Sequence, residues 1–212
     1  MSEGLVCVVD DDAAVGRSLC RLIRAVGLDA IAFPSAQTFL DHPPHDGPAC
    51  VLLDVRMPGL GGLDLQARLA ERQQTLPIIF ITGHSNVPTS VRAMKSGAVD
   101  FLQKPFNDDE VIAAVQRALA LSRHGRSDSA VRTEVERRLA ILTPRERQVF
   151  ELVVKGLLNK QIAGELGAAE QIIKIHRGRV MQKMQANSVA DLVRMAERVG
   201  LSKGIGPTTK AP

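Results

Sequence analysis

The sequence lacks any hydrophobic run that approaches the ~18–20 residues of a transmembrane helix. Its N-terminus also lacks the basic and then apolar pattern of a secretory signal peptide. Cysteine is scarce, and the three cysteines have no CxxC spacing and lie in apolar contexts at Cys7, Cys20 and Cys50. Structural zinc and a disulfide framework are therefore not expected. These absences predict a cytoplasmic protein with buried free thiols and no membrane partner.

The two halves of the chain carry net charges of opposite sign. Residues 1–123 carry 11 Lys and Arg against 14 Asp and Glu, a net charge of −3, whereas residues 124–212 carry 16 against 9, a net charge of +7. A length of 212 residues and a hydrophobic content of 45% predict two globular domains. The basic excess is compatible with an ordinary solvated surface, but it also suits a second domain that binds a polyanion.

The first half is organised around a short apolar run that ends in an acid. Val51–Leu53 has the continuous β-prone pattern of a buried strand, Asp54 closes it, and the segment 57–59 (MPG) breaks the chain into a loop. A carboxylate at the C-terminal end of a buried parallel strand lies where open α/β sheets bind their ligands. An aspartate that only caps a helix would give the same local pattern, so the other strands decide between the two.

Three further apolar runs are each followed by polar side chains: Leu5–Val9 before Asp10 and Asp11, Ile78–Ile81 before Thr82, and Val99–Leu102 before Lys104. With a fifth run at Asp29–Phe33 and helical patterns between the runs, the sequence predicts a doubly wound, five-stranded parallel α/β sheet. Three carboxylates gathered at one edge of that sheet would repel one another strongly. A divalent cation with oxygen ligands, such as Mg²⁺, relieves this repulsion.

Residues 122–137 are polar and carry no full apolar stripe, which predicts a linker whose second half is helical. Residues 138–203 then predict four short helices, the first opened by a capping box in the segment 143–146 (TPRE). A glycine turn at Gly167 separates the second helix from the third, which covers Glu170–Met184. This order is typical of an all-α helix-turn-helix domain. Residues 204–212 are predicted to be a disordered tail.

Four motifs of the first half, VVDD, LLDVRMPG, ITGH and DFLQKPF, resemble the receiver domain of two-component response regulators and occur in the family's order. The second half, LTPRERQVFELVVKGLLNKQIAGEL with IKIHRGRVMQKM, resembles a LuxR-type output domain, and the whole chain resembles FixJ-type regulators. The resemblance implies a flavodoxin-like receiver over residues 1–121 and a LuxR-type DNA-binding domain over residues 138–203.

For the first domain, the resemblance implies that Asp54 is the nucleophile that accepts a phosphoryl group. It further implies that Asp11, Asp54 and the backbone carbonyl of Arg56 bind Mg²⁺ directly, and that Asp10 acts through a water molecule.

Three other residues receive roles at the same edge. Lys104 would offer a compact cation to the transferred phosphoryl group, and Thr82 would offer a hydroxyl donor. Phe101 stands where the family has a rotating aromatic switch. Taken singly, these residues have simpler interpretations as a solvated lysine, a β-branched strand end and a core aromatic.

Arg56 argues against a phosphohydrolase with an aspartate nucleophile, because such an enzyme has a second aspartate two residues after the first, as general acid. The chain is therefore not expected to be an enzyme, beyond mediating its own phosphotransfer and slow dephosphorylation. Arg56 and His84 each lie two residues after a site residue, beside the path of an attacking water, so we expect both to set the lifetime of the phosphoryl group.

In the third helix of the second domain, Lys174, Ile175 and Gly178 share the outward face that is expected in the major groove. The residues predicted to contact DNA are Lys160, Gln171, Lys174, Ile175, Arg177 and Gly178, of which Lys160 and Arg177 suit phosphate contacts. His176 has helical spacing from inward-facing residues and is more simply a packed histidine.

The same helix departs from its relatives at two positions. Ala169 stands where related helices begin with Ser or Thr, so a side-chain cap is missing. Ile172 replaces a common threonine and removes a donor to phosphate. Both departures concern DNA affinity rather than the class of function.

The implied partners are a sensor histidine kinase, promoter DNA, RNA polymerase and, on phosphorylation, a second copy of the chain. Candidate dimer contacts are Val91 and Lys95 near Phe101, and Leu192 and Met195 in the last helix. The alternative function is a receiver that acts through protein contact only, with DNA binding that is weak or independent of phosphorylation. The helix-turn-helix pattern favours the DNA-binding function.

Overall fold

The computed structural model describes residues 4–72, 74–83 and 87–201. The chain forms two compact units that divide between Ser127 and Asp128, and each unit is described by itself. His84 and the predicted tail 204–212 lie outside the described residues. No helix among the described residues is both long enough and apolar enough to span a membrane.

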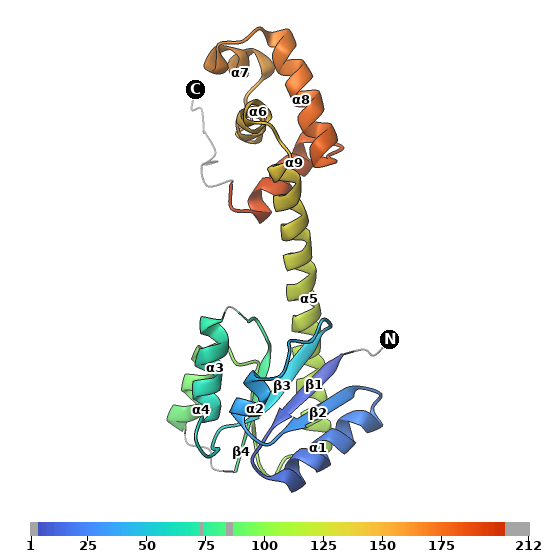
Figure 1. The fold of residues 1–212 in the computed structure, drawn as a ribbon, viewed down its shortest axis with the longest axis vertical. Helices are drawn as coiled ribbons and strands as arrows, with labels where there is room; N and C mark the ends of the chain where they lie inside the picture. Colours follow the sequence, from blue (N-terminus) through green and yellow to red (C-terminus); the bar gives the residue numbers. More distant parts are fainter. Residues whose placement is uncertain (1–3, 73, 84–86, 202–212) are drawn as a thin grey trace, which may run out of the picture. The chain divides into compact units, whose positions relative to one another are not determined.

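The first unit is a parallel sheet with strand order β2-β1-β3-β4-β5, covered by helices on both faces (Figure 1). Its elements are β1 (Leu5–Val9), α1 (Ala13–Ala25), β2 (Asp29–Phe33), α2 (Ala36–Leu40), β3 (Ala49–Asp54), α3 (Gly62–Glu71), β4 (Ile78–Thr82), α4 (Val87–Lys95), β5 (Asp100–Gln103) and the first part of α5 (Asp108–Ala140). This confirms the predicted doubly wound, flavodoxin-like sheet.

Two apolar clusters form the core of the first unit, one on each face of the sheet. Val6 and Val8 of β1 lie in the cluster that also contains residues of α1 and α5, whereas Cys7 and Val9 lie in the cluster with residues of α2, α3 and α4. β1, β3 and β4 are buried along their whole length, because both of their faces are covered. The three cysteines are free and buried, as predicted.

Gly62 at the start of α3 lets that helix pass directly behind the end of β3. A Cβ atom at this position would lie 2.3 Å from the carbonyl oxygen of Asp54. Only glycine therefore fits here without displacing the backbone of Asp54.

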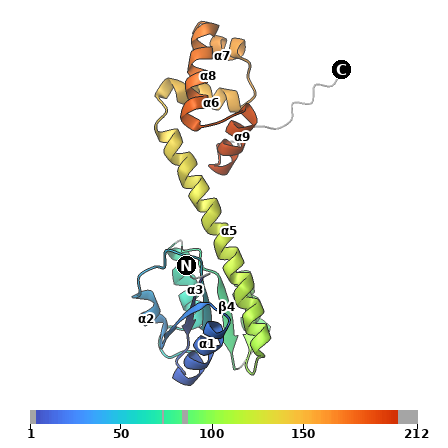
Figure 2. The same cartoon turned by 90° about the vertical axis from the view of Figure 1, so that its right-hand side faces the viewer.

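The second unit consists of the C-terminal part of α5 with α6 (Pro144–Val154), α7 (Asn159–Leu166), α8 (Glu170–Met184) and α9 (Val189–Arg198), shown from a second side in Figure 2. The capping box of Thr143 and Glu146 opens α6, as predicted. Gly167 has left-handed φ and ψ angles of 60° and 40° and ends α7, which makes the turn before α8. The helix-turn-helix prediction is confirmed.

The predicted linker, residues 122–137, lies wholly within α5, so its second half is helical as expected and the helix also includes its first half. The Ser122 hydroxyl accepts a hydrogen bond from the Ala49 amide at 3.1 Å, so the start of the range belongs to the first unit. Val135, near its end, is buried in the core of the second unit. Salt bridges one helical turn apart, such as Arg132–Glu136 at 2.9 Å, support the polar middle of the helix without an apolar stripe.

Candidate functional site

Side chains from three strand ends meet at the carboxyl edge of the sheet. Lys104, after β5, donates a hydrogen bond from Nζ to Asp10 Oδ2 at 2.8 Å and another to Asp54 Oδ1 at 3.0 Å. Asp10 and Asp54 follow or end the neighbouring strands β1 and β3, and both are buried, with exposed fractions of 3% and 6%. The sequence prediction that these polar residues converge is therefore confirmed for this trio.

Backbone amides hold the remaining carboxylate oxygens. The Arg56 amide donates to Asp54 Oδ2 at 2.7 Å, and the Asp12 amide donates to Asp10 Oδ1 at 2.8 Å. In each carboxylate, one oxygen therefore accepts a hydrogen bond from a backbone amide and the other accepts one from Lys104. This arrangement fixes both groups at the strand ends and leaves their further lone pairs available to a cation or a reacting group.

Burial and ion pairing act against each other at this edge. Burial raises the pKa of Asp54 and outweighs the hydrogen bonds from Lys104 and the Arg56 amide, which lower it. Burial by itself lowers the pKa of Lys104, but hydrogen bonds to Asp10 and Asp54 outweigh that effect, and the pKa of the ammonium group is raised. Lys104 therefore stays protonated and supplies positive charge beside Asp54.

Thr82 ends β4 beside β3, and its exposed fraction is 2%. The ring of Phe101, on β5, is partly buried and lies with its centroid 6.3 Å from that of Phe80. The structure thus places Thr82 on the strand next to Asp54 and Phe101 on the strand next to Thr82. Their roles in binding and switching stay predictions.

The carboxylates of Asp10 and Asp54 fit Mg²⁺, because this ion takes oxygen ligands. Asp11 is exposed, and within the described part of the chain no three acidic, histidine or cysteine side chains lie close enough together to hold a metal ion. Mg²⁺ does not need such a cage, since it keeps several waters and takes one or two carboxylates together with phosphate oxygens. The side chain of Arg56 is exposed beside this edge.

In the second unit, α8 presents the predicted outward face. Ile173, Val180 and Met184 are fully buried, whereas Gln171, Lys174, Ile175 and Gly178 are exposed. Gly178 has no neighbour that a side chain would meet. Lys160, near the start of α7, is exposed as well. The structure therefore leaves this surface free for a ligand.

Two predicted DNA contacts have partners that the sequence did not reveal. Arg177 Nη1 donates to the side-chain oxygen of Asn159 at 3.0 Å and so ties α8 to α7. Lys174 Nζ lies 3.6 Å from a carboxylate oxygen of Glu170, one turn earlier. Nδ1 of His176 is buried without a hydrogen-bond partner among the described residues, so this half-buried side chain is packed as expected.

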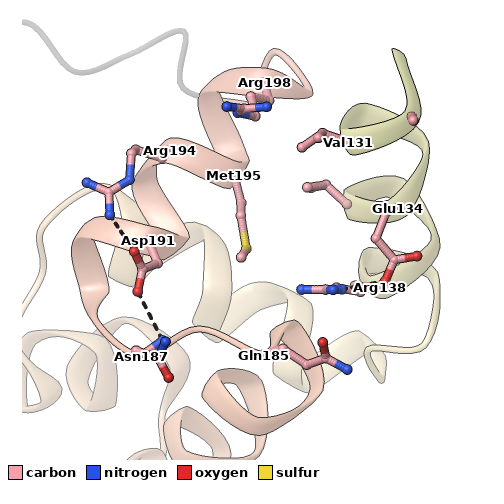
Figure 3. Close-up of a pocket in the computed structure, with 11 residues that line it drawn as sticks. Val131, Glu134, Arg138, Gln185, Asn187, Asp191, Arg194, Met195 and Arg198 are labelled. Carbon is pink, nitrogen blue, oxygen red and sulfur yellow. Dashed lines mark hydrogen bonds and ion pairs between the residues drawn. The ribbon is translucent and has the colours of Figure 1, made fainter. Parts of the chain in front are cut away.

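The structure corrects one predicted dimer contact. Leu192 is fully buried in the core of the second unit and cannot meet a second copy without unfolding. Met195 is partly buried, and Figure 3 shows its side chain pointing into the groove between α9 and the C-terminal part of α5. On α4, Val91 and Lys95 are exposed, as is the neighbouring Met94, with exposed fractions of 45% for Val91 and 46% for Met94.

Two family models match the chain. The response regulator receiver domain matches residues 6–116, and the luxR family of bacterial regulatory proteins matches residues 140–196.

Similar proteins cover nearly the whole chain. Nodulation protein W of Bradyrhizobium diazoefficiens is 49% identical over 201 residues, which is 95% of this chain and 88% of that protein. Transcriptional regulatory protein FixJ of the same organism is 45% identical over 200 residues, which is 94% of this chain and 98% of that protein.

Solved structures of response regulators resemble this chain in both fold and sequence. The response regulator StyR superposes with a TM-score of 0.81 at 42% identity, with 92% of this chain and 98% of that chain covered. Full-length FixJ from B. japonicum gives a TM-score of 0.58 at 45% identity, with 95% and 99% covered. The chain therefore belongs to the two-component response regulators of the FixJ type, with a receiver domain followed by a LuxR-type DNA-binding domain.

Proposed function

We propose that Asp54 accepts a phosphoryl group from a sensor histidine kinase and that the phosphorylated chain then binds promoter DNA as a dimer. The observation that carries this proposal is the meeting of Asp10, Asp54 and Lys104 at the carboxyl edge of the sheet, with the Lys104 ammonium within 3.0 Å of both carboxylates. A buried carboxylate with a fixed cation beside it is poised for attack on an electrophilic phosphorus.

In the transfer, an oxygen of Asp54 forms a bond to phosphorus while the bond between phosphorus and the donor nitrogen of phosphohistidine breaks. Lys104 moves its hydrogen bond from Asp54 to a phosphoryl oxygen, and the hydroxyl of Thr82 donates to another. Asp10, Asp11, Asp54 and the Arg56 carbonyl would hold Mg²⁺, which neutralises phosphoryl charge when bound.

The signal leaves the site through Thr82 and Phe101. Thr82 shifts toward the phosphoryl group, and the ring of Phe101 fills the space behind it. Because Phe101 lies on β5, beside α4, the surface that carries Val91 and Lys95 changes shape and pairs with a second copy. Pairing tethers two DNA-binding domains and raises their effective concentration at a two-part site.

In the second unit, α8 enters the major groove. Gln171, Lys174, Ile175 and Gly178 face the bases, and Lys160 contacts a phosphate. The guanidinium of Arg177 uses one donor on Asn159 and retains four for a phosphate.

Binding of the full chain to promoter-proximal DNA, with and without a small phosphoryl donor, tests the proposal. We expect tighter binding and a dimer in sedimentation with the donor, and neither change for Asp54→Asn. The matched control is Asp46→Asn, in an exposed loop. A monomer that binds DNA equally well with and without donor would contradict phosphorylation-driven pairing.

A further inference from the structure

A cavity of about 400 Å³ lies in the first unit, at the edge of the sheet opposite the carboxyl edge that carries Asp54. It is formed where β1 and β3 begin, and it lies under the loop after α2 and beside the end of α3. Ala49 and Asp54 lie at the two ends of β3, five residues apart, so about 17 Å separates this cavity from the phosphoryl site. The two sites are therefore distinct.

The floor of the cavity is apolar. Leu5, Cys7, Phe39 and Ala49 line it, and each has an exposed fraction below 10%. Burial raises the pKa of the Cys7 thiol to about 11, so this group is a neutral part of the floor rather than a nucleophile. A cavity of this size, with an apolar floor and polar groups around it, has the dimensions of a small-molecule site.

The rim is cationic. Arg72 and Arg126 line the cavity together with His42 and His45, and no residue of the lining is Asp or Glu. Arg126 donates from Nη2 to the Asp46 carbonyl oxygen at 2.7 Å, which holds the guanidinium in place, and its other donors have no acceptor in the described chain. The Arg72 guanidinium has no hydrogen bond or ion pair with any described residue. Two arginines without a carboxylate partner, above an apolar floor, complement an anion that has an apolar body.

We propose that this cavity binds a small amphipathic carboxylate, whose acid group bridges Arg72 and Arg126 and whose hydrocarbon part rests on Leu5, Cys7 and Phe39. Ser122 and Arg126 belong to α5, so the ligand contacts the helix that carries the boundary between the two units. The chain would then take a chemical input in addition to the one at Asp54.

Titration of the ¹⁵N-labelled full chain with octanoate, and separately with octanol as the uncharged analogue, tests this proposal. We expect octanoate to shift the amide signals of Leu5, Cys7 and Leu76, and to bind at least tenfold more tightly than octanol. The double variant Arg72→Gln/Arg126→Gln should bind octanoate at least tenfold more weakly and octanol unchanged.

Arg68→Gln is the matched control, because Arg68 is an exposed arginine of α3 that does not line the cavity. Asp54→Asn should bind octanoate like the parent, which separates this site from the phosphoryl site. Absence of shifts at the cavity amides, equal affinity for octanoate and octanol, or equal octanoate affinity in the double variant would each overturn the proposal. Shifts there with an acidic peptide but not with octanoate would overturn it in favour of a protein partner.

Discussion

Lys104 and Asp54 stand 50 positions apart in the sequence, yet Nζ of the first donates to Oδ1 of the second at 3.0 Å. Their side chains meet because β3 and β5 both end at the carboxyl edge of a parallel sheet, with only β4 between them. The same ammonium group also binds Asp10, so one cation holds two buried carboxylates that would otherwise repel each other.

Replacing Lys104 by methionine should slow phosphoryl incorporation at Asp54 by roughly 10- to 100-fold, because a charge-assisted hydrogen bond contributes about 1.5–3 kcal/mol. The initial rate of labelling from a small phosphoryl donor measures the effect. Lys95→Met is the control, since Lys95 is an exposed lysine of the same unit. A parental rate in Lys104→Met would remove this residue from the reacting site.

Lys174→Ala should change the base preference of the chain, whereas Lys160→Ala should weaken binding to all sequences alike. Lys174 lies on the exposed face of α8, and phosphate contacts carry no sequence information. Binding to a library of sites at several salt concentrations distinguishes them, and loss of one phosphate contact should reduce the salt slope by about 1. A uniform loss for Lys174→Ala would place this residue on the DNA backbone instead.

Leu192→Ala should lower the free energy of unfolding of the second unit by about 2–5 kcal/mol, because Leu192 is fully buried in its core. Met195→Ala, at a partly buried position of the same helix, should cost about 1 kcal/mol. Denaturant unfolding followed by helical circular dichroism measures both. A Leu192→Ala variant with the parent's midpoint would contradict the buried placement of this side chain.

Acid should weaken the second unit through Glu146. Its carboxylate is buried and accepts hydrogen bonds from Lys183 Nζ at 2.6 Å and the Thr143 amide at 2.8 Å. The bond from Lys183, followed by the one from the Thr143 amide, lowers the pKa of Glu146 to about 2. The folded pKa lies below the unfolded value of about 4.3, so the stabilisation is complete above that value and is lost as pH falls toward 2.

The free energy of unfolding, measured between about pH 5 and pH 2, tests this prediction for Glu146. Solvent screens the half-buried Lys183, so the stability that this pair loses is about 1–2 kcal/mol. Glu146→Gln should lose less stability over this range than the parent. The same fall in both proteins would show that other carboxylates carry the acid sensitivity.

The sheet and its polar edge could be predicted from the sequence because four of the five strands lie in apolar runs that a polar residue follows, at Asp10, Asp54, Thr82 and Lys104. Strand order is not encoded in that pattern, but parallel strands share one carboxyl edge whatever their order. Asp54 and Lys104 could therefore be placed together without knowledge of the topology.

Two kinds of feature could not be predicted from the sequence. One is a contact between two helices, and the other is a helix that lacks an apolar stripe. Arg177 and Asn159 are 18 positions apart, and no local pattern joins them. An apolar stripe on a helix does not show whether it meets the core of its own unit or a second copy, so the stripe alone does not reveal that Leu192 is a core residue. The sequence of residues 122–137 does not show that the first half of this range is helical as well, because the helix is supported by salt bridges rather than by a wide buried face.

Phosphoryl labelling of the full chain, with hydroxylamine used to identify an acyl phosphate, tests the central claim most directly. The parent and Asp46→Asn should incorporate label that hydroxylamine releases, and peptide mapping should locate it at Asp54. Asp54→Asn should incorporate none while keeping the helical content of the parent. Undiminished, hydroxylamine-sensitive label in Asp54→Asn would show that another carboxylate is the acceptor.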